Sequence, residues 1–133
     1  LVGFTTILEK FCDENLNEET VFFIEPLRRH KEEWLKVSVE IGERTLKDPN
    51  EAGAAAYDYL MYSGYIVLGY FWARMAILSQ NKIGSSDKSF YEAKLITAKF
   101  YFERILPRTR YHYESISSGA ENLMEMPADM FSL

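Results

Sequence analysis

The stretch Ala54–Leu78, AAAYDYLMYSGYIVLGYFWARMAIL, decides how this chain folds. Its only charged residues are Asp58 and Arg74. A helix on the surface of a small bundle carries a single apolar stripe, whereas this stretch is apolar on nearly every side. The pattern therefore predicts a helix that other parts of the protein cover on more than one side.

The boundaries of this helix are marked by residues typical of helix ends. Asp48 can cap the N-terminus, Pro49 suits the first helical position, and Glu51 can reach back to the cap. The pattern continues to about Gln80, and Gly84 closes the turn that follows. A helix of thirty-odd residues at 1.5 Å per residue would be roughly 45–50 Å long.

An amphipathic pattern precedes this central helix. Its apolar stripe alternates steps of four and three residues and consists of Phe23, Leu27, His30, Trp34, Val37 and Ile41. The other faces carry charges of both signs, as on a solvated surface. Pro26 is tolerated in the first turn of such a helix, or it kinks a helix that begins near Glu18.

The rest of the chain also predicts helices, and no strand pattern is found. Ser86 or Ser89 can cap an aromatic-rich helix, which Pro107 must kink or end. We therefore expect an all-α fold, a four-helix-bundle-like antiparallel bundle in one domain. Its expected parts are a short helix at 1–14, long helices at 18–47, 49–81 and 87–117, and a tail at 118–133.

Three interpretations of the central helix compete. A membrane span needs about 20 continuous apolar residues, and the uncharged run Tyr59–Ala73 is shorter. A helix buried by its own bundle needs more neighbours than this chain supplies. We favour a helix that packs on its own bundle and on another domain or subunit. Gly64 and Gly69 support this, because each costs on the order of 1 kcal/mol in a helix interior and lets a neighbour approach closely.

Composition narrows the class of protein. The net charge of −5 argues against binding of nucleic acid or of an anionic membrane. Cys12 is the only cysteine, so an internal disulfide is impossible and a cytoplasmic location is expected. The chain starts without methionine, and we interpret it as a piece of a longer protein.

No residue pattern in this chain predicts a catalytic, cofactor-binding or metal-binding site. The Glu-x-x-His motif of di-iron bundles is absent. His30 lies on the apolar stripe, which predicts a core histidine with satisfied hydrogen bonds. His112 is expected at a solvated helix end, and the basic residues between Lys94 and Arg110 are expected to be solvated as well.

Three segments carry a resemblance to a known family. They are AYDYLMYSGYIVLGYFWARMA (56–76), AKLITAKFYFERILPRTRYH (93–112) and SGAENLM (118–124). They resemble the domain appended to the C-terminus of a subgroup of acyl-CoA dehydrogenases that includes 3-methylmercaptopropionyl-CoA dehydrogenase-like enzymes. The resemblance covers residues 51–126 well and the first fifty residues weakly.

The resemblance implies that the parent protein is a flavoenzyme that oxidises the α,β carbon–carbon bond of an acyl-CoA. FAD and the catalytic glutamate would belong to upstream domains, and an electron-transfer flavoprotein would accept the electrons. This chain would bind no FAD itself. It would cover the catalytic bundle or support the interface with a sister subunit of a homo-oligomer. The residues expected at that contact are Tyr59, Tyr62, Ile66, Tyr70 and Phe71. The alternative is a free-standing helical domain that binds another protein.

Overall fold

The computed structural model describes residues 1–132 and confirms the all-α class. No strand occurs within this range. The α-helices are α1 (Val2–Asn15), α2 (Val21–Lys47), α3 (Asn50–Lys82), α4 (Lys88–Phe100), α5 (Thr109–Ser117) and α6 (Glu121–Met124). Three shorter segments have other helical geometries. The segment η1 (Tyr101–Ile105) is a π-helix, and η2 (Leu106–Arg108) and η3 (Ala128–Phe131) are 3-10 helices.

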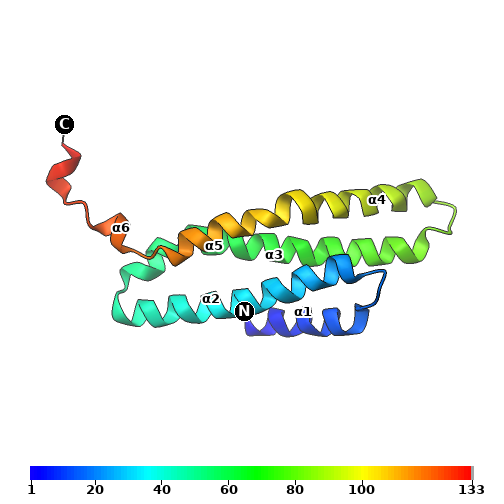
Figure 1. The fold of residues 1–133 in the computed structure, drawn as a ribbon, viewed down its shortest axis with the longest axis horizontal. Coiled ribbons are helices and arrows are strands. Elements are labelled where there is room, and N and C mark those ends of the chain that lie inside the picture. The colour runs from blue at the N-terminus through cyan, green and yellow to red at the C-terminus, as the bar shows by residue number, and fades with distance from the viewer. Residues whose placement is uncertain (133) are drawn as a thin grey trace.

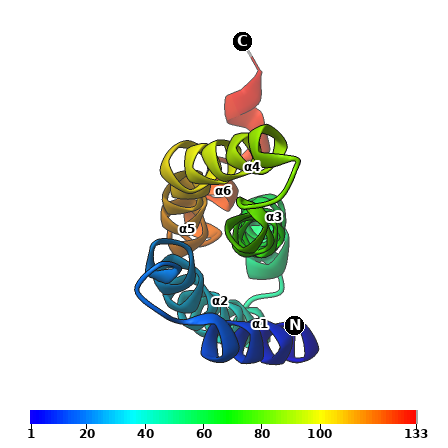
Figure 2. The same cartoon turned by 90° about the vertical axis from the view of Figure 1, so that its right-hand side faces the viewer.

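The long helices lie side by side, and the chain reverses direction between α2 and α3 and again between α3 and α4 (Figure 1). Helix α1 lies along α2, while α6 and η3 lead away from one end of the bundle. Seen end-on, α2 and α5 both lie to one side of α3, and no helix lies beside its opposite side (Figure 2). No helix in the described residues combines the length and the apolar character needed to cross a membrane.

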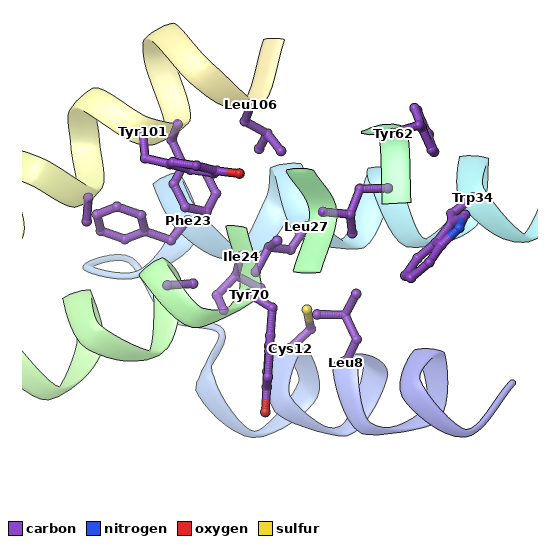
Figure 3. Packing of buried hydrophobic residues seen from close by; sticks show 14 of the residues in the cluster. Leu8, Cys12, Phe23, Ile24, Leu27, Trp34, Tyr62, Tyr70, Tyr101 and Leu106 are labelled. Carbon is purple, nitrogen blue, oxygen red and sulfur yellow. The ribbon is translucent and has the colours of Figure 1, made fainter. Parts of the chain in front are cut away.

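The core lies where α1, α2 and α3 meet the η1–η2 segment that follows α4 (Figure 3). Leu8 and Cys12 of α1 pack there with Leu27 of α2. The ring of Phe11 meets the ring of Tyr70 edge-on, with 5.1 Å between their centroids. Helix α1 therefore covers part of both α2 and α3.

The expected helix at 87–117 is interrupted in the middle. Helix α4 gives way to a π-helical turn, η1, and then to a 3-10 turn, η2, before α5 begins. Pro107 lies in η2 and has no N–H to donate to the preceding turn, which explains the irregular segment. Tyr101 anchors this segment, because its buried hydroxyl donates a hydrogen bond of 2.7 Å to the carbonyl of Tyr65 in α3.

Two expected helix caps are wrong. Asp48 Oδ1 accepts a hydrogen bond from the N–H of Asn50 at 3.0 Å, but Glu51 does not reach back to it. Glu51 turns toward the end of α5 instead, where its Oε1 accepts a hydrogen bond from the N–H of Ala120. Neither Ser86 nor Ser89 caps α4, which follows Asp87 without a side-chain cap.

Candidate functional site

The five residues expected at a contact surface divide between two sides of α3. Tyr62 and Ile66 are 0% exposed, and Tyr70 is also buried. These three belong to the domain's own core, because α1, α2 and the α4–α5 segment cover that side of α3. Tyr59 is half-buried, and its hydroxyl lies 2.7 Å from Ser38 Oγ of α2. Phe71 alone among the five is well exposed, at 46%.

The uncovered side of α3 carries a second apolar stripe. Steps of three and four residues place its members on one face. We call this set the outer stripe, and it consists of Gly53, Tyr57, Leu60, Gly64, Leu68, Phe71, Met75 and Leu78. Apart from Met75, its large side chains are 46–69% exposed; they are Tyr57, Leu60, Leu68, Phe71 and Leu78. The outer stripe contains no charged residue, and contiguous apolar surface of this kind marks contact sites on soluble proteins.

The two interior glycines of α3 have different surroundings. A Cβ atom on Gly69 would lie 3.4 Å from Leu27 Cδ2 and 3.5 Å from Leu106 Cδ1, so this glycine serves close packing inside the domain. A Cβ atom on Gly64 would meet nothing within 4 Å. The close approach expected at both glycines therefore exists within the chain only at Gly69, while Gly64 opens onto the outer stripe.

A polar cluster joins α2, α3 and α5. Glu33 of α2 accepts hydrogen bonds from the hydroxyl of Tyr62 at 2.6 Å and from Arg110 at 3.0 Å. Burial, together with the hydrogen bond to the Glu33 carboxylate, raises the pKa of Tyr62. The same carboxylate raises the pKa of Arg110 by its hydrogen bond. Because these side chains form hydrogen bonds with one another, the cluster links α2, α3 and α5.

His30 lies beside this cluster and is buried. Its Nδ1–H donates to the carbonyl of Pro26 at 2.6 Å, because a carbonyl can only accept. Its Nε2 lies 3.0 Å from Thr109 Oγ1, whose single hydroxyl hydrogen is shared between this nitrogen and the carbonyl of Leu106, 2.7 Å from Oγ1. Burial lowers the pKa of His30, so the neutral ring is favoured. Its place in the core with hydrogen-bonded ring nitrogens agrees with the sequence-based expectation.

His112 does not lie at a solvated helix end, and that expectation is wrong. Its ring is buried between α3 and α5, with Nδ1 2.7 Å from Asp58 Oδ1. Tyr57 and Tyr65 lie next to the ring, with centroids 6.0 and 5.7 Å away. Asp58 is one of only two charges in the apolar stretch of α3. A lone carboxylate on an apolar helix needs a partner, and this signal could have located His112.

Groups suited to other chemistry are separated in this fold. Cys12 is buried, and burial raises the pKa of its thiol to about 11, which keeps the thiol protonated near neutral pH. Within residues 1–132, no three side chains of the metal-ligating types converge. Glu33 and Glu40 lie two turns apart on α2.

Comparison with known proteins gives one family. The family described as "Acetyl-CoA dehydrogenase C-terminal like" matches residues 4–127. The match begins within α1 and ends beyond α6, so it includes residues 4–50, where the sequence resemblance was weak. A comparison with curated proteins finds no match.

Proposed function

The chain belongs to the acetyl-CoA dehydrogenase C-terminal-like family, the C-terminal domains of acyl-CoA dehydrogenases, and from this premise we propose its role in such an enzyme. The role is that of an accessory domain of an FAD-dependent acyl-CoA dehydrogenase. The parent enzyme oxidises the α,β bond of an acyl-CoA and belongs to the 3-methylmercaptopropionyl-CoA dehydrogenase-like subgroup. The domain covers the catalytic bundle or supports the interface with a sister subunit.

One observation carries this proposal, the two apolar sides of α3. The inner side, with Tyr62 and Ile66, is buried in the domain's own core. The outer stripe, with Leu60 and Leu68, is exposed over the length of the same helix. Covering apolar surface stabilises an assembly by about 25 cal/mol per Å² removed from water. An enzyme body or a sister subunit supplies that cover.

The residues of this chain do not fit FAD. The pocket between α2 and the η1–α5 segment has a volume of about 240 Å³. The groove beside Phe71, Arg74 and Met75 is larger, at about 430 Å³, which is within the roughly 300–1,000 Å³ of pockets for drug-sized ligands, and FAD is larger than those ligands. Glu33, Arg110 and His30 line the smaller pocket and are already hydrogen-bonded to other residues of the chain. FAD would be held by other domains of the parent enzyme, with an electron-transfer flavoprotein as the electron acceptor.

The test uses the complete protein that contains this chain. We expect it to purify with a flavin whose visible absorbance bleaches when an acyl-CoA is added without oxygen. His30→Gln should leave the rate of bleaching unchanged, because His30 bonds only to groups of this domain. A protein without flavin contradicts the proposed enzyme. A large loss of rate in a stably folded His30→Gln variant contradicts the accessory role.

The alternative is a free-standing domain that binds another protein through the outer stripe. Exposure of Tyr57 and Leu60 fits this alternative as well, and the family match over residues 4–127 is what favours the accessory role. The sequence upstream of the chain separates the two proposals. An open reading frame with acyl-CoA dehydrogenase domains supports the accessory role, and its absence supports the free-standing domain.

A further inference from the structure

We propose that the outer stripe of α3 pairs with the same stripe of a second copy of this chain. The two α3 helices run antiparallel and cross at Gly64, on a two-fold axis. This inference rests on the proposed role of the outer stripe as a contact surface and identifies its partner. Three features of the stripe carry the inference: its internal symmetry, its free glycine and its area.

The outer stripe is nearly symmetric about Gly64. Leu60 and Leu68 lie four residues before and after it, and Tyr57 and Phe71 lie seven residues before and after it. In an antiparallel pair related by a two-fold axis at Gly64, Leu60 of one copy faces Leu68 of the other. Tyr57 likewise faces Phe71. Such self-complementarity is what a two-fold interface requires, because both copies present the same surface.

Gly64 fits the crossing point. It lies in the interior of the 33-residue α3, where glycine weakens a helix. Apart from the adjacent residues and the nearby backbone of α3 itself, no atom of the chain would be within 4 Å of a Cβ at this position, so packing inside the domain does not explain the glycine. A helix without a side chain at the crossing lets a second helix approach closely. Close packing of a second copy against α3 would explain why glycine occupies this position.

The area and the charge of the stripe suit a dimer. From the exposed fractions of Tyr57, Leu60, Leu68 and Phe71, the residues that face one another, each copy would cover roughly 500 Å². Two copies would together bury about 1,000 Å², the area that a specific interface has to reach. The stripe is free of charges, so the two-fold axis brings no like charges together. In an antiparallel pair the two helix dipoles also point in opposite directions, which is the favourable arrangement.

Cysteine cross-linking in the 133-residue chain tests the pairing. The variants are Leu60→Cys and Leu68→Cys, and Cys12 is too buried to compete. Mixing the two variants and oxidising them should give a covalent dimer, because positions 60 and 68 face each other. Each variant alone should link poorly. Two copies of position 60 would be about 12 Å apart along the axis, and a disulfide spans only about 4.4–6.8 Å between Cα atoms.

A second pair of variants tests the crossing point. Gly64→Leu should weaken the dimer by about tenfold or more, measured by sedimentation, because its side chain separates the helices. It should leave the helical circular dichroism of the chain intact, since the position is open. The matched control is Gly42→Leu, which changes an equally open glycine on α2 and should leave the dimer unchanged.

The outcomes separate this inference from the proposed function. A folded chain that stays monomeric at every concentration overturns the pairing. Links formed by Leu60→Cys alone overturn the antiparallel arrangement, and a dimer without either link overturns the use of this stripe. None of these results affects flavin bleaching by the parent enzyme, which tests the accessory role independently.

Discussion

Glu51, in the first turn of α3, accepts a hydrogen bond at its Oε1 from the backbone N–H of Ala120, 3.2 Å away. Arg44 near the end of α2 completes the junction, because it donates to the carbonyl of Ile116 at 3.0 Å. The start of α3, the end of α2 and the end of α5 thus meet at one point. Gly119, with a φ of +75°, lets the chain leave α5 toward this carboxylate.

Gly119→Ala should lower the free energy of unfolding by about 1–2 kcal/mol, since an L-residue with a side chain is strained at positive φ. Its Cβ would also lie 3.2 Å from Glu51 Oε1, so the junction would have to shift. Urea unfolding measures the change. The control is Gly42→Ala, at an open helical position, which should raise stability by about 0.5–1 kcal/mol. Equal effects of the two changes would contradict this role of Gly119.

Tyr62→Phe should cost about 1.5–3 kcal/mol, the usual value of a hydrogen bond to a charged group. The variant removes the donor to Glu33 and leaves the ring in the core. Tyr57→Phe is the matched control, because Tyr57 is exposed and should change stability by less than about 0.5 kcal/mol. The two free energies of unfolding should differ clearly at neutral pH. If they do not, the Glu33 hydrogen bond contributes nothing measurable.

Stability should fall as the pH drops below about 6.5, and His30 should account for part of that fall. The unfolded chain has an ordinary histidine pKa near 6.5, while burial lowers the folded pKa. Between these two values the unfolded state binds more protons, so acid favours unfolding, and the contribution is complete above pH 6.5. In His30→Gln, the loss of unfolding free energy between pH 7.5 and pH 5 should be smaller than in the unchanged protein. An identical loss would show that His30 is not kept neutral by the fold.

Gly69→Val and Gly64→Val should affect the fold differently. The methyl groups of valine at position 69 would extend beyond a Cβ that already contacts Leu27 and Leu106. Overpacking of this kind costs about 1–3 kcal/mol. Valine at position 64 meets open space and should change the stability of the monomer little. Thermal unfolding at low concentration, where a dimer dissociates, makes the comparison, and a similar loss in both variants would contradict it.

The all-α class could be predicted from the sequence because it follows from helical periodicity and local signals. The central helix was expected at 49–81 and lies at Asn50–Lys82. The interruption before α5 was expected only as a kink or an end at Pro107. Its actual form, a π turn with Tyr101 bonded to Tyr65, depends on contacts with α3 that no local pattern contains.

The candidate site was harder to predict for a physical reason. Both sides of α3 are apolar, so the sequence shows that two surfaces need covering but not which one faces the core. The choice among Tyr59, Tyr62, Ile66, Tyr70 and Phe71 therefore mixed the inner side with the outer stripe. Similarly, the lone carboxylate of Asp58 indicates that a partner is needed, but nothing near His112 in the sequence shows that its ring lies 2.7 Å away on another helix.

The central claim is that another protein surface covers the outer stripe in the assembled enzyme. Thiol labelling in the complete protein tests it most directly, with Leu68→Cys as the probe and Leu46→Cys as the control. Leu46 is 89% exposed on α2, outside the stripe, and Cys12, the native thiol of this chain, is buried with a pKa of about 11. Labelling of the complete protein without either added cysteine gives the background from its other thiols. We predict that a maleimide modifies position 68 much more slowly than position 46, and that dilution or mild denaturant removes the difference. Equal rates at the two positions in the native assembly would contradict the account.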